Sequence, residues 1–111
     1  MTTAELETRR RAALDLGNSI RTYRADLKLD LATGHATLAE TLAGNDPRIA
    51  TMRIRDLLLA VPALGATKVR RALAANDMQP RTRVENVSTR RREALIVWLR
   101  EHHPAAWESI G

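Results

Sequence analysis

The sequence contains no cysteine, no phenylalanine, two tryptophans and one tyrosine. The absence of cysteine excludes disulfide bonds, thiolate metal ligands and a cysteine nucleophile. The scarcity of aromatic rings argues against binding of single-stranded nucleic acid, which relies on stacking of bases on aromatic side chains. The core must therefore be aliphatic and is expected to consist of leucine, alanine, valine and isoleucine.

Long apolar runs are also missing. No stretch approaches the roughly 18 apolar residues that a transmembrane helix needs. The N-terminus, MTTAELETRRR, has no apolar segment of the kind found in signal peptides. We therefore expect an intracellular protein that makes no membrane contact. The length of 111 residues predicts one domain, and the 44% of hydrophobic residues indicates a folded chain.

Positive charge is concentrated in one quarter of the chain. The net charge is +5, and 16 of the 18 basic residues are arginine. Residues 65–92 hold eight basic residues but only two acidic ones, so this segment carries a net charge of +6 and the rest carries −1. The basic residues of the segment are Lys68, Arg70, Arg71, Arg81, Arg83, Arg90, Arg91 and Arg92. Such a cluster indicates a polyanionic partner.

The spacing of apolar residues predicts an all-α fold, because no stretch alternates apolar and polar residues as a strand does. We divide the chain into a long N-terminal helix, 1–34, and a helical domain, 35–111, which together form one structural unit. The expected helices span about 4–32, ended by Gly34; from a cap at Thr37 to Gly44; from Asp46-Pro47 to the residue before Pro62; from Gly65 to about 76; and from a cap at Ser88 to about His103, before Pro104.

The stretch VPALGATKVRR, residues 61–71, predicts a tight turn followed by a basic helix. Leu64 is expected to plug the core, and Gly65 to adopt a left-handed backbone. The free amide groups from Gly65 to Lys68 would then form an anion site at the helix N-terminus. Lys68 is unfavourable beside the positive end of the helix dipole unless an anion joins it. The alternative is a packing hairpin with solvated charges.

Five stretches of the chain resemble the actinobacterial integration host factor family, which consists of small nucleoid-associated DNA-binding proteins. They are RRAAL at 10–14, RADLK at 24–28, MRIRDLLLAVPALGATKV at 52–69, MQPRTR at 78–83 and RREAL at 91–95. The resemblance implies a long N-terminal helix and a helix–two-turn–helix module that holds the backbone of duplex DNA. It also implies DNA bending with little sequence preference.

By this resemblance, Gly65 and Lys68 fall on the module's glycine and lysine, and Arg83 falls on a DNA-contacting arginine. The family's loop continues with arginine–glycine–leucine–glycine, whereas this chain reads VENVS and places Glu85 where an arginine is expected. We expect Arg81 and the run Arg90–Arg92 to replace that charge. The predicted DNA-binding residues are Gly65, Ala66, Thr67, Lys68, Arg70, Arg71, Arg81, Arg83, Arg90 and Arg91.

The long helix carries a second basic strip with acidic residues interspersed. Arg10, Arg21 and Arg24 form either a second DNA surface or a solvated face of mixed charge. We expect the protein to be monomeric when it is not bound to DNA. The duplex RNA backbone is the alternative partner, because the same kind of hairpin also grips RNA.

The sequence offers no constellation for catalysis, cofactor binding or metal binding. His102 and His103 are adjacent on a helix and therefore point about 100° apart, which makes them poor joint ligands. A DNA glycosylase is a weaker alternative, since it needs a base-flipping pocket and a catalytic group. Trp98 is expected in the core, and Trp107 is expected to fold back as a C-terminal plug.

Overall fold

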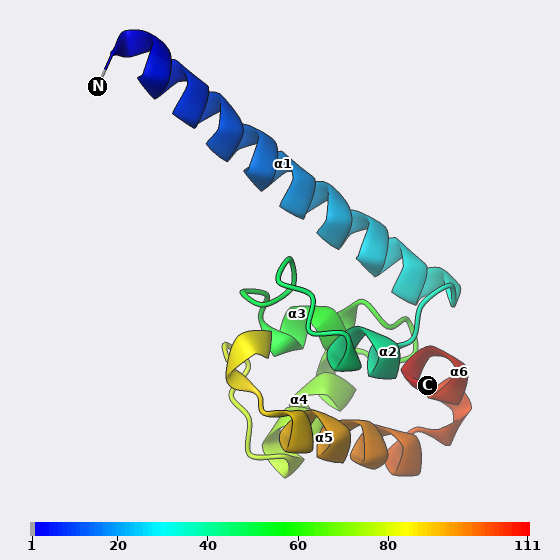
Figure 1. Ribbon diagram of the computed structural model, residues 1–111. Helices are drawn as coiled ribbons and strands as arrows, with labels where there is room; N and C mark the ends of the chain where they lie inside the picture. Colours follow the sequence, from blue (N-terminus) through cyan, green and yellow to red (C-terminus); the bar gives the residue numbers. More distant parts are fainter. Residues whose placement is uncertain (1) are drawn as a thin grey trace.

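The computed structural model describes residues 2–111, and within them the chain forms helices and no β-sheet (Figure 1). This confirms the predicted all-α fold class. The elements, including two short 3₁₀ helices named η1 and η2, are α1 (Thr3–Thr33), α2 (Leu38–Ala43), α3 (Ile54–Leu59), α4 (Ala66–Ala75), η1 (Val84–Asn86), α5 (Thr89–His102), η2 (Pro104–Ala106) and α6 (Trp107–Ile110). None of these helices combines the length and hydropathy that crossing a bilayer requires.

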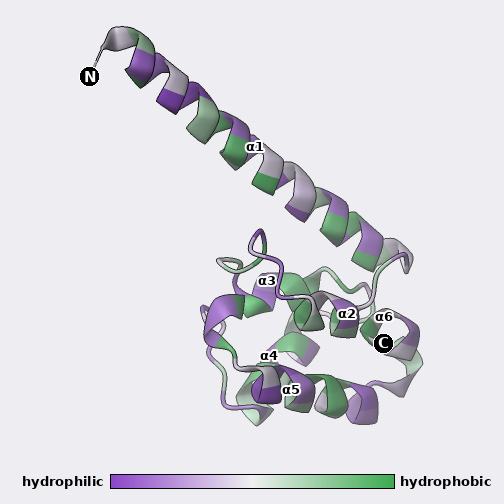
Figure 2. Cartoon of the chain, viewed as in Figure 1, coloured by the Kyte–Doolittle hydropathy of each residue, from purple (hydrophilic) through white to green (hydrophobic). Residues whose placement is uncertain are grey.

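Helix α1 lies within one residue of the predicted span at each end, and Gly34 ends it as predicted. The Thr2 hydroxyl accepts a hydrogen bond from the Glu5 amide at 3.2 Å, and Gly34 ends the helix with a left-handed φ of 82°. The N-terminal part of α1 projects away from the other helices (Figure 1), which gives the molecule a longest dimension of 58 Å. Hydrophilic and hydrophobic residues are mixed along this projection (Figure 2).

Only the C-terminal third of α1 contributes to the core. Leu27 and Leu31 are buried, whereas Leu6 and Leu16, which lie nearer the N-terminus of the same helix, are 42% and 64% exposed. Near the body, the Arg24 guanidinium donates to the Arg48 carbonyl at 2.7 Å and to the Thr51 hydroxyl at 2.6 Å. These bonds fasten α1 to the loop that precedes α3.

Helices α2 and α5 are capped by the predicted residues. The hydroxyl of Thr37 accepts from the Glu40 amide at 3.2 Å, and that of Ser88 accepts from the Arg91 amide at 3.3 Å. A side chain oxygen at the cap satisfies an amide that has no partner inside the helix, which typically stabilises the helix by about 1 kcal/mol. Short polar residues therefore define both boundaries locally.

The prediction that Asp46-Pro47 opens the third helix is wrong. Residues 47–51 form turns, with the Ile49 amide donating to the Asp46 carbonyl at 3.1 Å, and α3 begins only at Ile54. The Asp46 carboxylate accepts from both the amide and the guanidinium of Arg48, at distances of 2.7 to 3.0 Å. The carboxylate thus closes a local turn that competes with helix formation.

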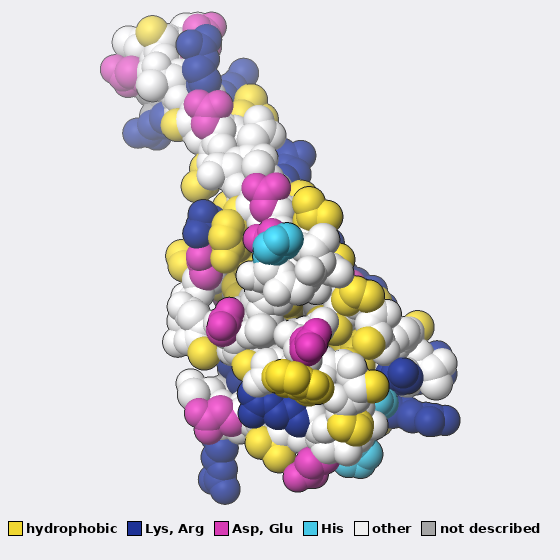
Figure 3. Space-filling model, turned by 90° about the vertical axis from the view of Figure 1, so that its right-hand side faces the viewer, with side chains coloured by type: hydrophobic (Ala, Val, Ile, Leu, Met, Phe, Trp, Pro, Cys, Tyr) yellow, Lys and Arg dark blue, Asp and Glu magenta, His cyan; other side chains and the backbone are white. Residues whose placement is uncertain are grey.

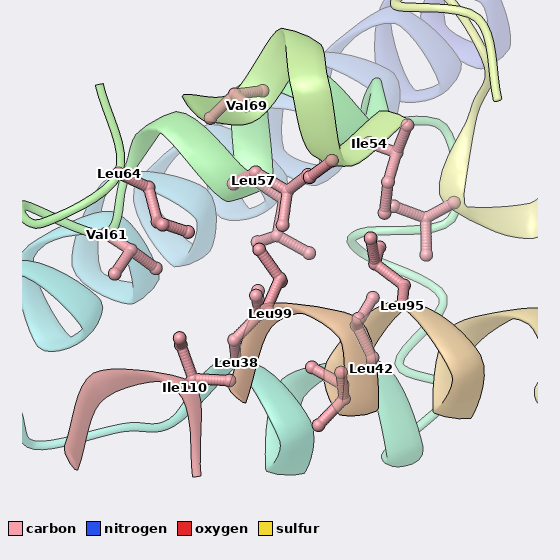
Figure 4. Close-up of a cluster of buried hydrophobic side chains, with 14 of the residues drawn as sticks. Leu38, Leu42, Ile54, Leu57, Val61, Leu64, Val69, Leu95, Leu99 and Ile110 are labelled. Carbon is pink, nitrogen blue, oxygen red and sulfur yellow. The ribbon is translucent and has the colours of Figure 1, made fainter. Parts of the chain in front are cut away.

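The core is aliphatic, as the missing phenylalanine predicts. Figure 4 shows side chains from α2, α3, α4, α5 and α6 converging on one interior. Burying each leucine contributes about 1.5–3 kcal/mol relative to leaving it exposed. The fully buried large side chains are Leu31, Leu38, Leu42, Ile49, Ile54, Leu57, Leu58, Leu64, Leu73, Leu95, Leu99 and Ile110.

The C-terminal segment folds back on α5 after Pro104, as Figure 1 shows. Ala106 and Ile110 fill the interior, whereas Trp107 is 61% exposed. The expected plug therefore exists, but Ile110 forms it rather than Trp107. Trp98 is half-buried against the core and stacks on His102, with ring centroids 3.9 Å apart.

Candidate nucleic-acid interface

The turn between α3 and α4 is anchored by Leu64, which is only 2% exposed and packs in the core as predicted. The predicted left-handed backbone at Gly65 is wrong, because its φ and ψ are −77° and 171°. Gly65 is the N-cap of α4, and N-cap residues have extended backbone angles. A Cβ atom at this position would meet no atom within 4 Å.

The first amides of α4 have no hydrogen-bond acceptor in the described chain. The Val69 amide donates to the Gly65 carbonyl at 3.0 Å, which is the first bond of the helix. The amides of Ala66, Thr67 and Lys68 precede it and make no hydrogen bond within residues 2–111. No side chain caps the helix and its first turn contains no acidic residue. These amides therefore face solvent with the positive end of the helix dipole behind them.

Lys68 lies across the turn at this end of α4. Its Nζ donates to the Ala63 carbonyl at 3.2 Å, and its side chain is exposed. His103 lies in the same neighbourhood. Burial lowers the pKa of His103, and the charges of Lys68 and His102 lower that pKa further. The Nε2 atom of His103 is buried without a hydrogen-bond partner in the described chain. The ionisable groups around the turn are therefore basic.

A surface groove of about 290 Å³ is lined by residues of α3 and α4, which pack against each other beneath it. Arg55 from α3 and Arg70 from α4 line it, above an apolar floor of Leu59, Val69 and Leu73. Arg55 pairs with Asp56 at 3.4 Å, and the two side chains are 43% and 41% exposed. An exposed pair of this kind contributes roughly 0–1 kcal/mol, so Arg55 stays available to another anion.

Arg71 lies on the opposite side of α4 from the core. Helical geometry turns residue 71 about 200° from Val69, which is buried with Ala72 and Leu73. Arg70 and Lys68 lie on the two flanks of the same helix. The predicted basic residues of α4 therefore spread over its exposed surface rather than converging on one point.

The loop after α4 brings Arg83 against a residue that sequence reasoning missed. Arg83 and Arg53 form an isolated antiparallel bridge, in which the Ile54 amide donates to the Thr82 carbonyl at 2.8 Å. Arg81 in the same loop donates to the Gln79 side chain at 3.1 Å. No local pattern reveals the Arg53 pairing, because thirty residues of chain separate its two members.

The three arginines at the start of α5 have three different surroundings. Arg90 is exposed. Arg91 donates to the carbonyls of Asn76 and Asp77 at 3.1 and 2.6 Å, and so caps the end of α4. Arg92 is only 9% exposed, so the expectation that it adds surface charge is wrong. Its guanidinium donates to the carbonyls of Leu42, Val84 and Val87 and to the Asn45 side chain.

Glu85 follows in η1. Its amide donates to the Ala50 carbonyl at 2.9 Å, which holds the backbone. Its carboxylate is exposed and forms no ion pair among the described residues. The negative charge therefore lies two residues from Arg83 without a structural partner.

The second basic strip lies on α1, where Figure 3 shows acidic and basic side chains interspersed. Arg10 is exposed, and Arg21 donates to the Gly17 carbonyl at 3.3 Å on its own helix. Arg24 is engaged in the bonds to Arg48 and Thr51. Arg48 in turn lies 3.6 Å from the centroid of the Tyr23 ring and pairs with Asp46 at 2.7 Å.

The Arg48 guanidinium and amide hold the pKa of the Asp46 carboxyl well below its usual range. Arg24 is therefore placed in a network that joins α1 to the body. Arg10 and Arg21 form no hydrogen bond or ion pair with the basic residues of α3 and α4 in the described chain. Within residues 2–111, no three His, Asp or Glu side chains are grouped as metal ligands.

Two proteins from mycobacteria are similar in sequence to this chain. One is named "Integration host factor" from Mycobacterium tuberculosis, and the other has the same name and comes from Mycolicibacterium smegmatis. Each is 30% identical to the chain over 92 residues, which cover 81% of this chain and 88% of the relative. No protein-family model matches the chain, and no solved structure matches it.

Proposed function

The chain belongs to the integration host factor family, and on that premise we propose that it binds and bends duplex DNA as an architectural, nucleoid-associated protein. It does so with little preference for base sequence. The observation that carries the proposal is the N-terminus of α4, where three uncapped amides and Lys68 face solvent with no acidic residue in the first turn.

A phosphate of the DNA backbone supplies both the hydrogen-bond acceptors and the negative charge that this helix end lacks. The amides of Ala66, Thr67 and Lys68 donate to its oxygens, and the helix dipole favours its charge. Lys68 adds a cation whose position is unfavourable without an anion. Each hydrogen bond to a charged group contributes about 1.5–3 kcal/mol, so this one contact orients the protein on the duplex. Helices α3 and α4 with their turn thus serve as the helix–two-turn–helix module.

Further phosphates extend the contact along five exposed basic residues and the half-buried Arg91. Arg70 and Arg71 of α4, Arg81 and Arg83 of the loop, and Arg90 and Arg91 of α5 supply the charge. Arg91 keeps free N–H groups beyond the one nitrogen that caps α4. Contacts to phosphate position a protein without reading bases, which explains the proposed tolerance of sequence.

The long helix, 1–34, and the helical DNA-binding domain, 35–111, act as one unit in this proposal. The bonds of Arg24 to the loop before α3 hold the two parts together. Arg10 and Arg21 then form a second surface on the projecting helix. In this proposal the duplex bends to reach both surfaces, and a single copy of the chain suffices for this. The proposal involves no catalysis, cofactor or membrane contact.

The alternative partner is duplex RNA, because the α4 contact recognises a phosphate and not a sugar. A competition titration separates the two: unlabelled duplex DNA and duplex RNA of equal length displace a labelled DNA duplex at one salt concentration. We expect DNA to compete at a lower concentration, since an A-form duplex presents its phosphates with different groove dimensions. Stronger competition by RNA would replace the DNA proposal with the RNA one.

A further inference from the structure

The short extended pairing that holds the loop after α4 places two arginines face to face. The Ile54 amide donates to the Thr82 carbonyl at 2.8 Å, and the Val84 amide donates to the Met52 carbonyl at 2.9 Å. These bonds flank the bridge between Arg53 and Arg83. In an antiparallel pairing, the residues between two such bonds form the non-hydrogen-bonded pair, with Cα atoms about 4.5 Å apart and side chains on the same face.

No side-chain hydrogen bond or ion pair of the described chain offsets the repulsion between these two cations. Like charges directly opposite each other destabilise an antiparallel pairing. Neither guanidinium donates a hydrogen bond or forms an ion pair within residues 2–111, and both residues are exposed. The nearest carboxylate along the chain from Arg53 is that of Asp56, which pairs with Arg55. The backbone bonds explain why the two segments pair, but the stability of the fold does not explain why both paired positions carry arginine.

We propose that Arg53 and Arg83 form a clamp that binds a single backbone phosphate of the duplex between their two guanidinium groups. The inference rests on the proposed function: the resemblance implies a DNA contact at Arg83, and the structure adds Arg53 as a second ligand of the same phosphate. Guanidinium groups bind phosphate oxygens in a bidentate manner, and two of them on one face surround the anion. The anion removes the repulsion that the free protein carries.

The clamp and the N-terminus of α4 bind different phosphates. Arg53 precedes α3, and Arg83 belongs to the loop that follows α4, so both lie at the opposite end of the hairpin from Lys68. The ten residues of α4 span about 15 Å. Arg55 and Arg70 line the groove between the two sites. The module thus contacts the DNA backbone at both of its ends.

The first test measures stability without DNA. Arg53→Gln and Arg83→Gln each remove the repulsion, so each raises the thermal midpoint at low ionic strength. Arg9→Gln is the matched control, because it removes one exposed positive charge from α1 that faces no other arginine across a pairing. The difference disappears at about 1 M salt, where the Debye length is about 3 Å. The proposal is overturned if, at low salt, the thermal midpoints of both clamp variants equal the midpoint of Arg9→Gln.

The second test is a double-mutant cycle of duplex binding, read by fluorescence anisotropy. Each single substitution weakens binding about tenfold, and the double variant is scarcely weaker than either single one, because one phosphate requires both arginines. The salt slope falls by about one unit in each variant. Additive losses mean that the arginines contact separate phosphates, and losses no larger than that of Arg9→Gln mean that they contact none. Either result rejects the clamp while leaving DNA binding intact.

Inorganic phosphate separates the failure of the clamp from the failure of the proposed function. Added phosphate raises the thermal midpoint of the parent protein more than that of Arg53→Gln, since the site at α4 contributes equally to both. Equal rises reject the clamp. If the parent protein binds no duplex DNA but phosphate still distinguishes the two proteins, the clamp is retained and its ligand is a phosphate other than that of DNA.

Discussion

Replacing Lys68 with alanine separates the DNA contact at α4 from the packing of the hairpin. The side chain is exposed, and its Nζ makes one hydrogen bond, to the Ala63 carbonyl at 3.2 Å. Losing that bond costs about 0.5–1.5 kcal/mol, with solvent exposure favouring the lower end. Removing a cation from the positive end of the helix dipole contributes about 0.3–1 kcal/mol in the opposite direction. The free energy of unfolding therefore changes by less than about 0.5 kcal/mol.

DNA affinity responds differently to the same substitution. One charge-assisted contact to phosphate is lost, which at the lower end of about 1.5 kcal/mol weakens binding roughly tenfold. The slope of log affinity against log salt becomes shallower by about 0.9, because one phosphate is no longer neutralised. The loss is similar on every duplex sequence, since the contact reads no base.

The assay is anisotropy titration of a labelled duplex at several salt concentrations, combined with thermal denaturation of the free protein. Lys28→Ala is the matched control: Lys28 is the other lysine of the chain, is exposed on α1 and carries the same charge. Equal affinities and equal salt slopes for Lys68→Ala and Lys28→Ala would refute the phosphate site at α4. The stretch VPALGATKVRR would then be a hairpin that only packs the core.

Three further substitutions test individual parts of the site. Gly65→Val changes the unfolding free energy by less than about 1 kcal/mol, because the backbone is extended and a Cβ atom meets no atom within 4 Å. The same substitution weakens duplex binding by crowding the phosphate. A large loss of stability in a denaturant titration contradicts this. Glu85→Arg strengthens binding, since the carboxylate has no partner beside Arg83; weaker binding in anisotropy shows that the loop does not approach DNA. Burial lowers the pKa of His103 below its unfolded value of about 6.5, so the free energy of unfolding falls as the pH drops through that value. His103→Asn reduces this fall. A variant whose thermal midpoint has the same pH profile as the parent contradicts the prediction.

Local signals in the sequence predict most of the helix boundaries. Thr37 and Ser88 cap their helices, and Gly34 ends α1, because each acts on amides or backbone angles within a few residues. The same local logic fails at Asp46-Pro47. There the carboxylate has two possible uses, as a helix cap or as a partner for Arg48, and the loop context selects the second.

The roles of the arginines are less predictable, because they depend on distant segments. Arg92 is buried by bonds that include one to Leu42, and Arg24 is held by Thr51, in each case far away along the chain. Arg53 pairs with Arg83 in an isolated β-bridge that the periodicity of the sequence does not predict. A run of basic residues therefore predicts a polyanion partner, but it does not show which members face that partner.

The salt dependence of duplex binding tests the central claim most directly. Affinity is measured over a series of salt concentrations on two DNA duplexes of equal length and unrelated sequence. If about five phosphates are neutralised, log affinity falls with log salt at a slope of roughly −4 to −5 on both duplexes. A slope near zero, or a steep slope on only one of the two sequences, would contradict a protein that holds the DNA backbone without reading its bases.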